Sequence, residues 1–223
     1  MFNVRTSLLI AISSLVLVLT TGGSVYARGD RTFDVTITNV TQNQTFTPIL
    51  VASHTDKVRL FAAGEPAIEE LEILAEGGNP EPLRKLLESD DEVADVTDSG
   101  APLGPGDSVT ISVATSGKFR HVSVAAMLVP TNDAFVAVNG IKGPKGKEAV
   151  VFNALAYDAG TELNDELCVS IPAGGGCGGE GVSVANGEEF VHVHPGIHGI
   201  GDLSESVYDW RNPVARIRIV RSK

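Results

Sequence analysis

Short stretches of alternating apolar and polar residues run along much of the chain and predict β-strands. At residues 33–38, Phe33, Val35 and Ile37 fall on one face and polar residues fall on the other, as in a strand with one buried face. Residues 215–220 show the same alternation, with arginines on the outward face. Similar stretches lie at 49–52, 58–61, 108–114, 121–129, 135–138, 150–156 and 190–193. The pattern predicts an all-β fold, an antiparallel β-sandwich of about eight strands.

Two segments follow a helical period instead. After Pro66, apolar residues recur at helical spacing until a pair of glycines stops the pattern. A second short helix is expected after Pro82, with Leu83, Leu86 and Leu87 facing the sheet and its charged residues facing solvent. We expect these two helices to cap the sandwich.

Composition and charge narrow the class of protein. The chain has 223 residues, of which 43% are apolar and 20% are charged, so it is able to bury a core. Its 17 basic and 28 acidic residues give a net charge of −11, and no Lys/Arg block is longer than a pair, which argues against nucleic acid as a partner. Residues 90–107 hold five Asp and one Glu among Gly and Pro, which predicts a surface loop.

The first 27 residues have the pattern of a secretory signal peptide. Arg5 supplies a positive charge, residues 8–19 form a short apolar run, and small residues precede the expected cleavage after Ala27. The apolar run is too short to span a bilayer, which takes about 20 residues. We therefore expect a secreted, periplasmic or extracellular protein, not an integral membrane protein, whose mature chain is one domain at residues 28–223.

The chain has two cysteines, Cys168 and Cys177, which enclose eight residues with three successive glycines among them. Such a loop is flexible enough for the sulfurs to meet, and export to an oxidising compartment favours a disulfide over two free thiols. A disulfide that closes so short a loop constrains the unfolded chain only modestly. We expect it to fix a loop rather than to hold the fold together.

The acidic residues Asp133, Asp158 and Glu162 are the strongest candidates for a functional site. Each of their two segments leaves an apolar strand and enters a turn, so the three carboxylates are able to project at the same end of a sandwich. Ca²⁺ prefers such oxygen ligands and accepts irregular loops, and Gly160 allows the chain to fold back. The alternative is that Asp158 and Thr161 only cap a turn while Asp133 is solvated.

Several segments, in order, resemble the spondin amino-terminal domain. They read TPILVASH, VRLFAAGEPAIEELEILAEGG, MLVPTNDAFVAVNG, YDAGTE, HPGIHG and VARIRIVR, and they extend from Phe33 to Arg221. The most specific are residues 130–136, which are similar to the family's P-S-P-D-W-F-V segment, and residues 158–162, which are similar to its D-A-G-T-D turn.

The resemblance implies an antiparallel β-sandwich that holds a metal, taken to be calcium, through Asp133, Asp158 and Glu162. In this chain Glu162 stands where the family usually has Asp, and Ala134 stands where it usually has Trp. The resemblance also implies a secreted, non-enzymatic module for adhesion or for matrix or envelope contacts. Its partner would be an unidentified extracellular protein, glycan or lipid.

A second candidate site contains His192, His194 and His198. If this segment is a strand, His192 and His194 share a face, and His198 returns after the Pro-Gly turn to complete three nitrogen ligands for Zn²⁺ or Cu²⁺. The protein would then be a transition-metal-binding protein or a metalloenzyme. The alternative is that His192 and His194 face solvent on an edge strand and His198 lies in a loop.

Overall fold

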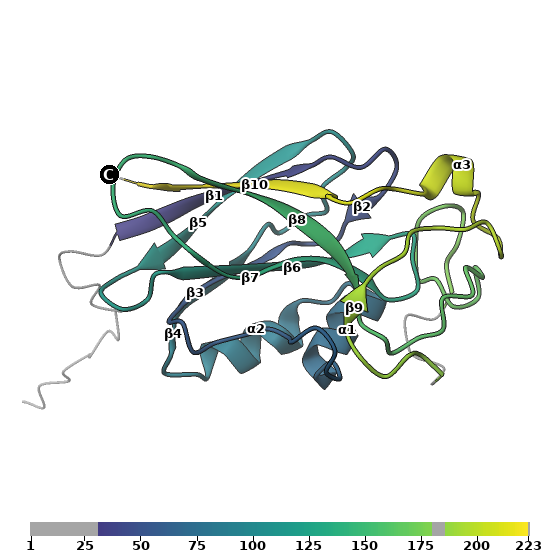
Figure 1. The fold of residues 1–223 in the computed structure, drawn as a ribbon, viewed down its shortest axis with the longest axis horizontal. Helices are drawn as coiled ribbons and strands as arrows, with labels where there is room; N and C mark the ends of the chain where they lie inside the picture. Colours follow the sequence, from purple (N-terminus) through teal and green to yellow (C-terminus); the bar gives the residue numbers. More distant parts are fainter. Residues whose placement is uncertain (1–30, 180–185, 223) are drawn as a thin grey trace, which may run out of the picture.

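The computed structural model describes residues 31–179 and 186–222, which contain ten strands and three helices (Figure 1). The signal peptide expected at residues 1–27 lies outside the described residues. The strands are β1 (Arg31–Asn39), β2 (Thr45–Phe46), β3 (Leu50–His54), β4 (Val93–Asp98), β5 (Ser108–Thr115), β6 (His121–Val129), β7 (Ala134–Lys142), β8 (Val150–Asp158), β9 (His192–Val193) and β10 (Ala215–Arg221). The helices are α1 (Glu69–Gly77), α2 (Glu81–Glu88) and α3 (Glu205–Tyr208).

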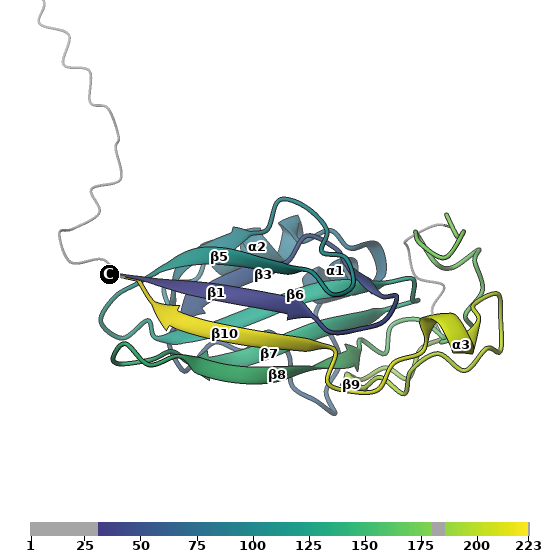
Figure 2. The same cartoon turned by 90° about the horizontal axis from the view of Figure 1, so that it is seen from above.

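The strands form one antiparallel sheet that curls into two layers. Its order is β4-β3-β6-β7-β8-β10-β1-β5, with β2 added to β6 and β9 added to β8. Strands β5, β1 and β10 lie over β3, β6 and β7 (Figures 1 and 2). The two edge strands, β4 and β5, approach each other, as a hydrogen bond shows: the Ala114 N–H on β5 donates to Asp95 Oδ2 on β4 at 2.6 Å. The predicted all-β, sandwich-like fold is thus confirmed, with a curl that brings it close to a barrel.

The alternation seen in the sequence fills the space between the layers. On β1, Phe33, Val35 and Ile37 are at most 1% exposed. Strand β10 pairs with β1 so that Ile217 lies opposite Ile37 and Ile219 lies opposite Val35, and both isoleucines are fully buried. Burying each such side chain contributes roughly 1.5 to 3 kcal/mol, so this pair of strands is a strong part of the core.

Helices α1 and α2 cover the outer face of the β3-β6-β7 layer and bury a second apolar cluster there (Figure 1). Helix α1 is followed by its C-cap residue, Gly78, whose left-handed conformation lets its N–H donate to the Leu74 carbonyl at 3.0 Å. On α2, Leu83 and Leu87 lie one turn apart and are buried. The prediction that Leu86 also faces the sheet is wrong, because it points to the side of that face and is 41% exposed.

Two sequence predictions about strands are wrong. Residues 58–61 form no strand, because the Asn139 side chain bonds their main chain instead: it accepts from the Leu60 N–H at 2.9 Å and donates to the Phe61 carbonyl at 2.6 Å. Residues 90–107 are not only a loop, since they contain β4, which pairs with β3. The strand expected at 190–193 is present only as the two residues of β9.

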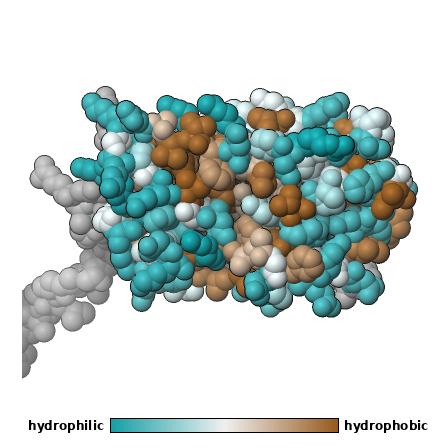
Figure 3. Space-filling model, in the orientation of Figure 1, coloured by the Kyte–Doolittle hydropathy of each residue, from teal (hydrophilic) through white to brown (hydrophobic). Residues whose placement is uncertain are grey.

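A long loop follows β8 and contains both cysteines. Cys168 and Cys177 form the predicted disulfide in that loop. None of the helices in residues 31–179 and 186–222 has the length and apolar character needed to cross a membrane. On the face shown in Figure 3, apolar residues lie in small patches separated by hydrophilic ones.

Candidate metal centre

Asp133 and Asp158 lie at the adjoining ends of two neighbouring strands. Asp133 directly precedes β7, and Asp158 is the last residue of β8. The strands are antiparallel, and Ala134 is the register partner of Asp158. The Ala159 N–H also donates to the Asp133 carbonyl at 3.2 Å. The β7–β8 pairing therefore brings these two acidic residues together, at one end of the sandwich.

The turn after β8 brings the main chain of Glu162 to the same place, although the side-chain donors of Asp133, Asp158 and Glu162 do not form a group that converges within 4.8 Å in the described residues. Gly160 has a φ of +71°, which reverses the chain, and its N–H donates to Asp158 Oδ1 at 2.7 Å. The next two N–H groups, of Thr161 and Glu162, donate to Asp133 Oδ2 at 2.9 and 3.1 Å. One carboxylate oxygen of Asp133 is thus saturated by the main chain of the Glu162 loop.

Two other carboxylate oxygens of this group are buried without a hydrogen-bond partner in the described residues. Asp133 is fully buried and Glu162 is 3% exposed. Within the described residues, neither Asp133 Oδ1 nor Glu162 Oε2 has a hydrogen-bond partner, although both atoms are buried. An ionised carboxylate without a partner is costly to bury, whereas a bound cation offsets that cost. Hard oxygen donors of this kind suit Ca²⁺.

The acidic side chains also raise one another's pKa. Burial, followed by the negative charge of Asp158, raises the pKa of Asp133 to about 7. Burial, followed by the charges of Glu76 and Asp133, raises the pKa of Glu162 to about 8. Burial likewise raises the pKa of Asp158. Glu76, on α1 and 3% exposed, adds a further buried carboxylate to this region, one that no local sequence pattern marks.

A small polar cavity lies beside Glu162. Its volume is about 80 Å³, which is room for a few water molecules. It is lined by Asn132, Glu162, Leu163, Asp165, Ser170 and Asn186. Of the three predicted ligands, only Glu162 lines this cavity. Ca²⁺ takes about 6 to 8 oxygen ligands and often keeps water among them, so the cavity is a place for such water on the Glu162 side of the cluster.

Two of the three candidate histidines face Asp158. His192 Nδ1 is 3.7 Å from Asp158 Oδ1, and His194 Nε2 is 3.7 Å from Asp158 Oδ2. His194 Nδ1 accepts from the Gly196 N–H at 3.0 Å, so Nε2 carries the proton and donates to Asn164 Oδ1 at 3.1 Å. Burial lowers the pKa of His194 to about 3. His194 is therefore neutral, does not form an ion pair with Asp158, and has both ring nitrogens occupied.

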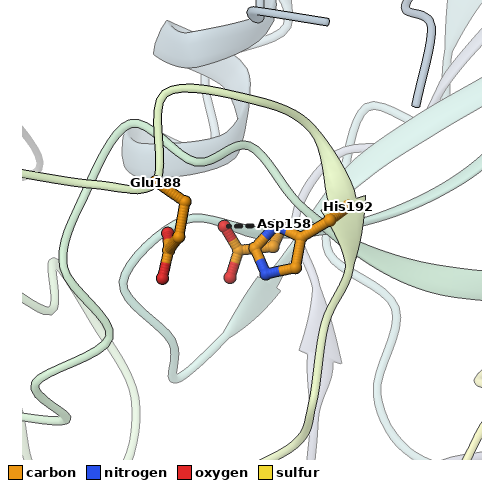
Figure 4. Close-up of side chains that lie close together, drawn as sticks. All are labelled: Asp158, Glu188 and His192. Atoms are coloured by element: carbon orange, nitrogen blue, oxygen red, sulfur yellow. Dashed lines mark ion pairs between the residues drawn. The ribbon is translucent and has the colours of Figure 1, made fainter. Parts of the chain in front are cut away.

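The third histidine is oriented differently. His198 is exposed, and its main-chain N–H donates to Glu166 Oε1 at 2.5 Å. In residues 31–179 and 186–222, the donor atoms that converge within 4.8 Å of one another belong to Asp158, Glu188 and His192 (Figure 4). Glu188 was not selected from the sequence, because its position depends on the tertiary course of the loop before β9.

Most of the described β-sheet, with the three predicted carboxylate ligands, lies in a region that matches a known protein family. Residues 33–165 match the family described as Spondin_N, the spondin N-terminal domain. The match spans more than half of the chain and includes Asp133, Asp158 and Glu162. This chain belongs to the spondin N-terminal domain family. The family is extracellular and generally non-enzymatic. No curated protein matches the chain.

The fold of this spondin domain continues beyond the matched residues. The match ends at Asp165, whereas β10 lies between β8 and β1 in the sheet and fills the core with Ile217 and Ile219. The segment after Asp165 also carries the disulfide, β9 and the histidines. The carboxylate site therefore lies within the matched part, whereas the group of Asp158, Glu188 and His192 joins that part to the segment that follows it.

Proposed function

We propose that this spondin domain is a secreted, non-enzymatic, calcium-binding module that makes adhesive contacts at a cell envelope or extracellular matrix. Asp133, Asp158 and Glu162 hold the ion. The observation that carries the proposal is the pair of buried carboxylate oxygens without a partner, Asp133 Oδ1 and Glu162 Oε2. The family of the domain and the Cys168–Cys177 disulfide support an extracellular location.

Calcium has a structural role in this proposal. It neutralises carboxylates that otherwise repel one another, and it links the turn before β7 to the loop after β8. Main-chain carbonyls and water complete its coordination shell. Because the ion binds the folded protein only, it stabilises that state by about 2.7 kcal/mol when free Ca²⁺ is about 100-fold above its Kd.

The ion also defines a surface for a partner. A coordination position filled by water in the free protein accepts a carboxylate or phosphate oxygen from a partner. An acidic protein, whose full chain has a net charge of −11, is in this way able to contact an anionic surface through the bound cation. The partner is an extracellular protein, glycan or lipid that presents such an oxygen.

The test is a calorimetric titration of the chelator-stripped mature protein with Ca²⁺, repeated on Asp158→Asn and accompanied by thermal melting. We expect the wild type to bind one ion and the variant to bind at least about tenfold more weakly. Asp91→Asn, which changes an exposed acidic residue outside the cluster, serves as the matched control and keeps wild-type affinity. Absence of both binding heat and a melting shift in the wild type would exclude the proposal.

A further inference from the structure

We propose that Asp158, Glu188 and His192 form a second metal site, for a borderline divalent transition metal such as Zn²⁺. The three side chains point toward one another, and their donor atoms lie within 4.8 Å of one another (Figure 4). This site does not rest on the proposed calcium function, although Asp158 belongs to both ligand sets. It shares only His192 with the histidine set considered from the sequence.

The β8–β9 ladder fixes two of the three ligands. Asp158 and His192 are register partners in that antiparallel pair. Residues directly opposite each other in such a pair place their side chains on the same face, with Cβ atoms about 4.5 to 5.5 Å apart. Asp158 is fully buried, and its carboxylate is oriented by the Gly160 N–H at 2.7 Å and by Asn164 Nδ2 at 2.6 Å. The anionic ligand is thus held in place before any metal binds.

The loop before β9 carries the third ligand across the turn after β8. The Glu189 N–H donates to the Gly160 carbonyl at 2.8 Å, and the Val191 N–H donates to the Glu65 carbonyl at 2.9 Å. These two hydrogen bonds anchor the main chain on the C-terminal side of Glu188. The Glu188 side chain therefore starts from an anchored main chain, while its own exposure leaves the carboxylate free to adjust to an ion.

The spacing of the donor atoms suits a small ion. His192 Nδ1 and Asp158 Oδ1 are 3.7 Å apart, too far for a hydrogen bond between them. His192 Nδ1 also lies 3.4 Å from the Phe190 carbonyl, a long contact that a bound metal would replace. Two donors that are each about 2.0 to 2.2 Å from one tetrahedral ion lie about 3.3 to 3.6 Å apart, so the Asp158–His192 pair needs only a slight contraction for Zn²⁺. The Glu188 donor lies within 4.8 Å of the other two, and its exposed side chain moves closer when the ion binds. One imidazole among two carboxylates favours a borderline ion over Ca²⁺, which prefers oxygen ligands alone.

The neighbouring histidines are not among the converging donors, which leaves a coordination position for water. His194 uses both ring nitrogens in hydrogen bonds, to Gly196 and Asn164. His198 is exposed, in the loop beyond β9. Three protein ligands and one water give the open arrangement of a zinc site that is able to bind a further ligand.

The test is a titration of the full mature protein with Zn²⁺, and with Co²⁺ as a spectroscopic probe, in the presence of saturating Ca²⁺. We expect one Zn²⁺ per chain, and we expect His192→Ala and Glu188→Gln each to weaken binding by about tenfold or more. His198→Ala and Glu189→Gln are the matched controls, and they keep the wild-type Kd within about twofold. Melting of each variant checks that it folds, and the exposed position of Glu188 makes Glu188→Gln informative even if His192→Ala is destabilised.

Asp133→Asn separates this proposal from the calcium proposal. We expect that variant to lose Ca²⁺ binding and to keep Zn²⁺ binding, because Asp133 is a ligand in only one set. If it loses Zn²⁺ as well, the carboxylate cluster binds Zn²⁺ and the second site is overturned. Zn²⁺ binding that is absent from the wild type, or unchanged in both His192→Ala and Glu188→Gln, would overturn it too. Zn²⁺ binding with the expected variant pattern but without any Ca²⁺ binding would support this site and reject only the calcium proposal.

Discussion

Glu92 and Glu162 have the same side chain, but their surroundings shift its pKa in opposite directions. Glu92 accepts from Lys57 Nζ at 2.9 Å and from Lys118 Nζ at 3.0 Å, and these hydrogen bonds lower its pKa to about 2. Glu162 is buried near Glu76 and Asp133, and burial together with their charges raises its pKa to about 8. The chain supplies its own cations to an acidic side chain that water already solvates. At Glu162, a hydrogen bond from Asn132 lowers the pKa, but burial and the neighbouring negative charges outweigh it. In the function proposed above, a calcium ion from solution supplies the positive charge that this cluster needs.

The largest effect expected from this comparison is that the free energy of unfolding of the metal-free protein depends on pH. The unfolded chain loses its carboxyl protons near pH 4, whereas folded Asp133 and Glu162 hold theirs until about pH 7 and 8. Between these values the folded state binds more protons than the unfolded state, so the free energy of unfolding falls as pH rises. We expect urea unfolding in chelator to show this fall between pH 5 and pH 9. Saturating Ca²⁺ reduces it, because the ion binds the ionised carboxylates.

A double variant, Asp133→Asn with Glu162→Gln, isolates the two groups. All other titrating groups are present in both proteins, so the difference between the two pH profiles comes from this pair and from its effect on neighbouring carboxyls such as Asp158. We expect the variant in chelator to lose most of the fall in stability, and to gain nothing from Ca²⁺. A metal-free wild type whose stability is constant or increases from pH 5 to pH 9 would contradict the electrostatic account of the cluster.

The fold could be predicted from the sequence where one face of a strand is buried and the other is exposed to solvent. Strands β1 and β10 meet that condition, and their alternation located them correctly. Strand β4 does not, because Asp95 and Asp98 lie in it and only Val96 is buried. The side chain of its Asp95 accepts a hydrogen bond from the Ala114 main-chain N–H on β5, a tertiary role without a local sequence pattern.

The candidate site likewise has residues that the sequence predicts and residues that it does not. Asp133 and Asp158 could be paired from the sequence because each lies where an apolar strand meets a turn, and antiparallel neighbours bring such ends together. Glu188 could not be assigned, because its place near Asp158 is set by hydrogen bonds from the loop before β9 to Gly160 and Glu65. The neutral state of His194 likewise follows from burial and from its contacts with Asn164 and Gly196, which its sequence neighbours do not reveal.

An intermediate effect is expected from the acidic residue that helix α1 adds to the cluster. Glu76→Gln removes a buried negative charge that raises the pKa of Glu162 and, to a lesser extent, of Asp133. The pKa of both carboxyls should therefore fall, which carbon-detected NMR titration of the side chains measures directly. Because a negative charge near the ion is lost, Ca²⁺ affinity should decrease, by less than about tenfold. Glu72→Gln, on the same helix, is the control, and an unchanged pKa of Glu162 in Glu76→Gln would rule out the coupling.

The smallest effect is expected where the chain already provides the cations. Lys57→Ala removes one of the two ammonium groups on Glu92, and Lys118 still holds the carboxylate. Since exposed ion pairs contribute little to stability, we expect the melting temperature at neutral pH to change by less than about 2 °C. The pKa of Glu92 is lowered, so the pair stabilises the fold above the unfolded value near 4.5, and this contribution is lost as pH falls toward 2. The difference between wild type and Lys57→Ala should thus shrink in acid, the opposite trend to that of the buried cluster. A larger difference at pH 3 than at pH 7 would show that the lysines stabilise the domain by packing rather than by charge.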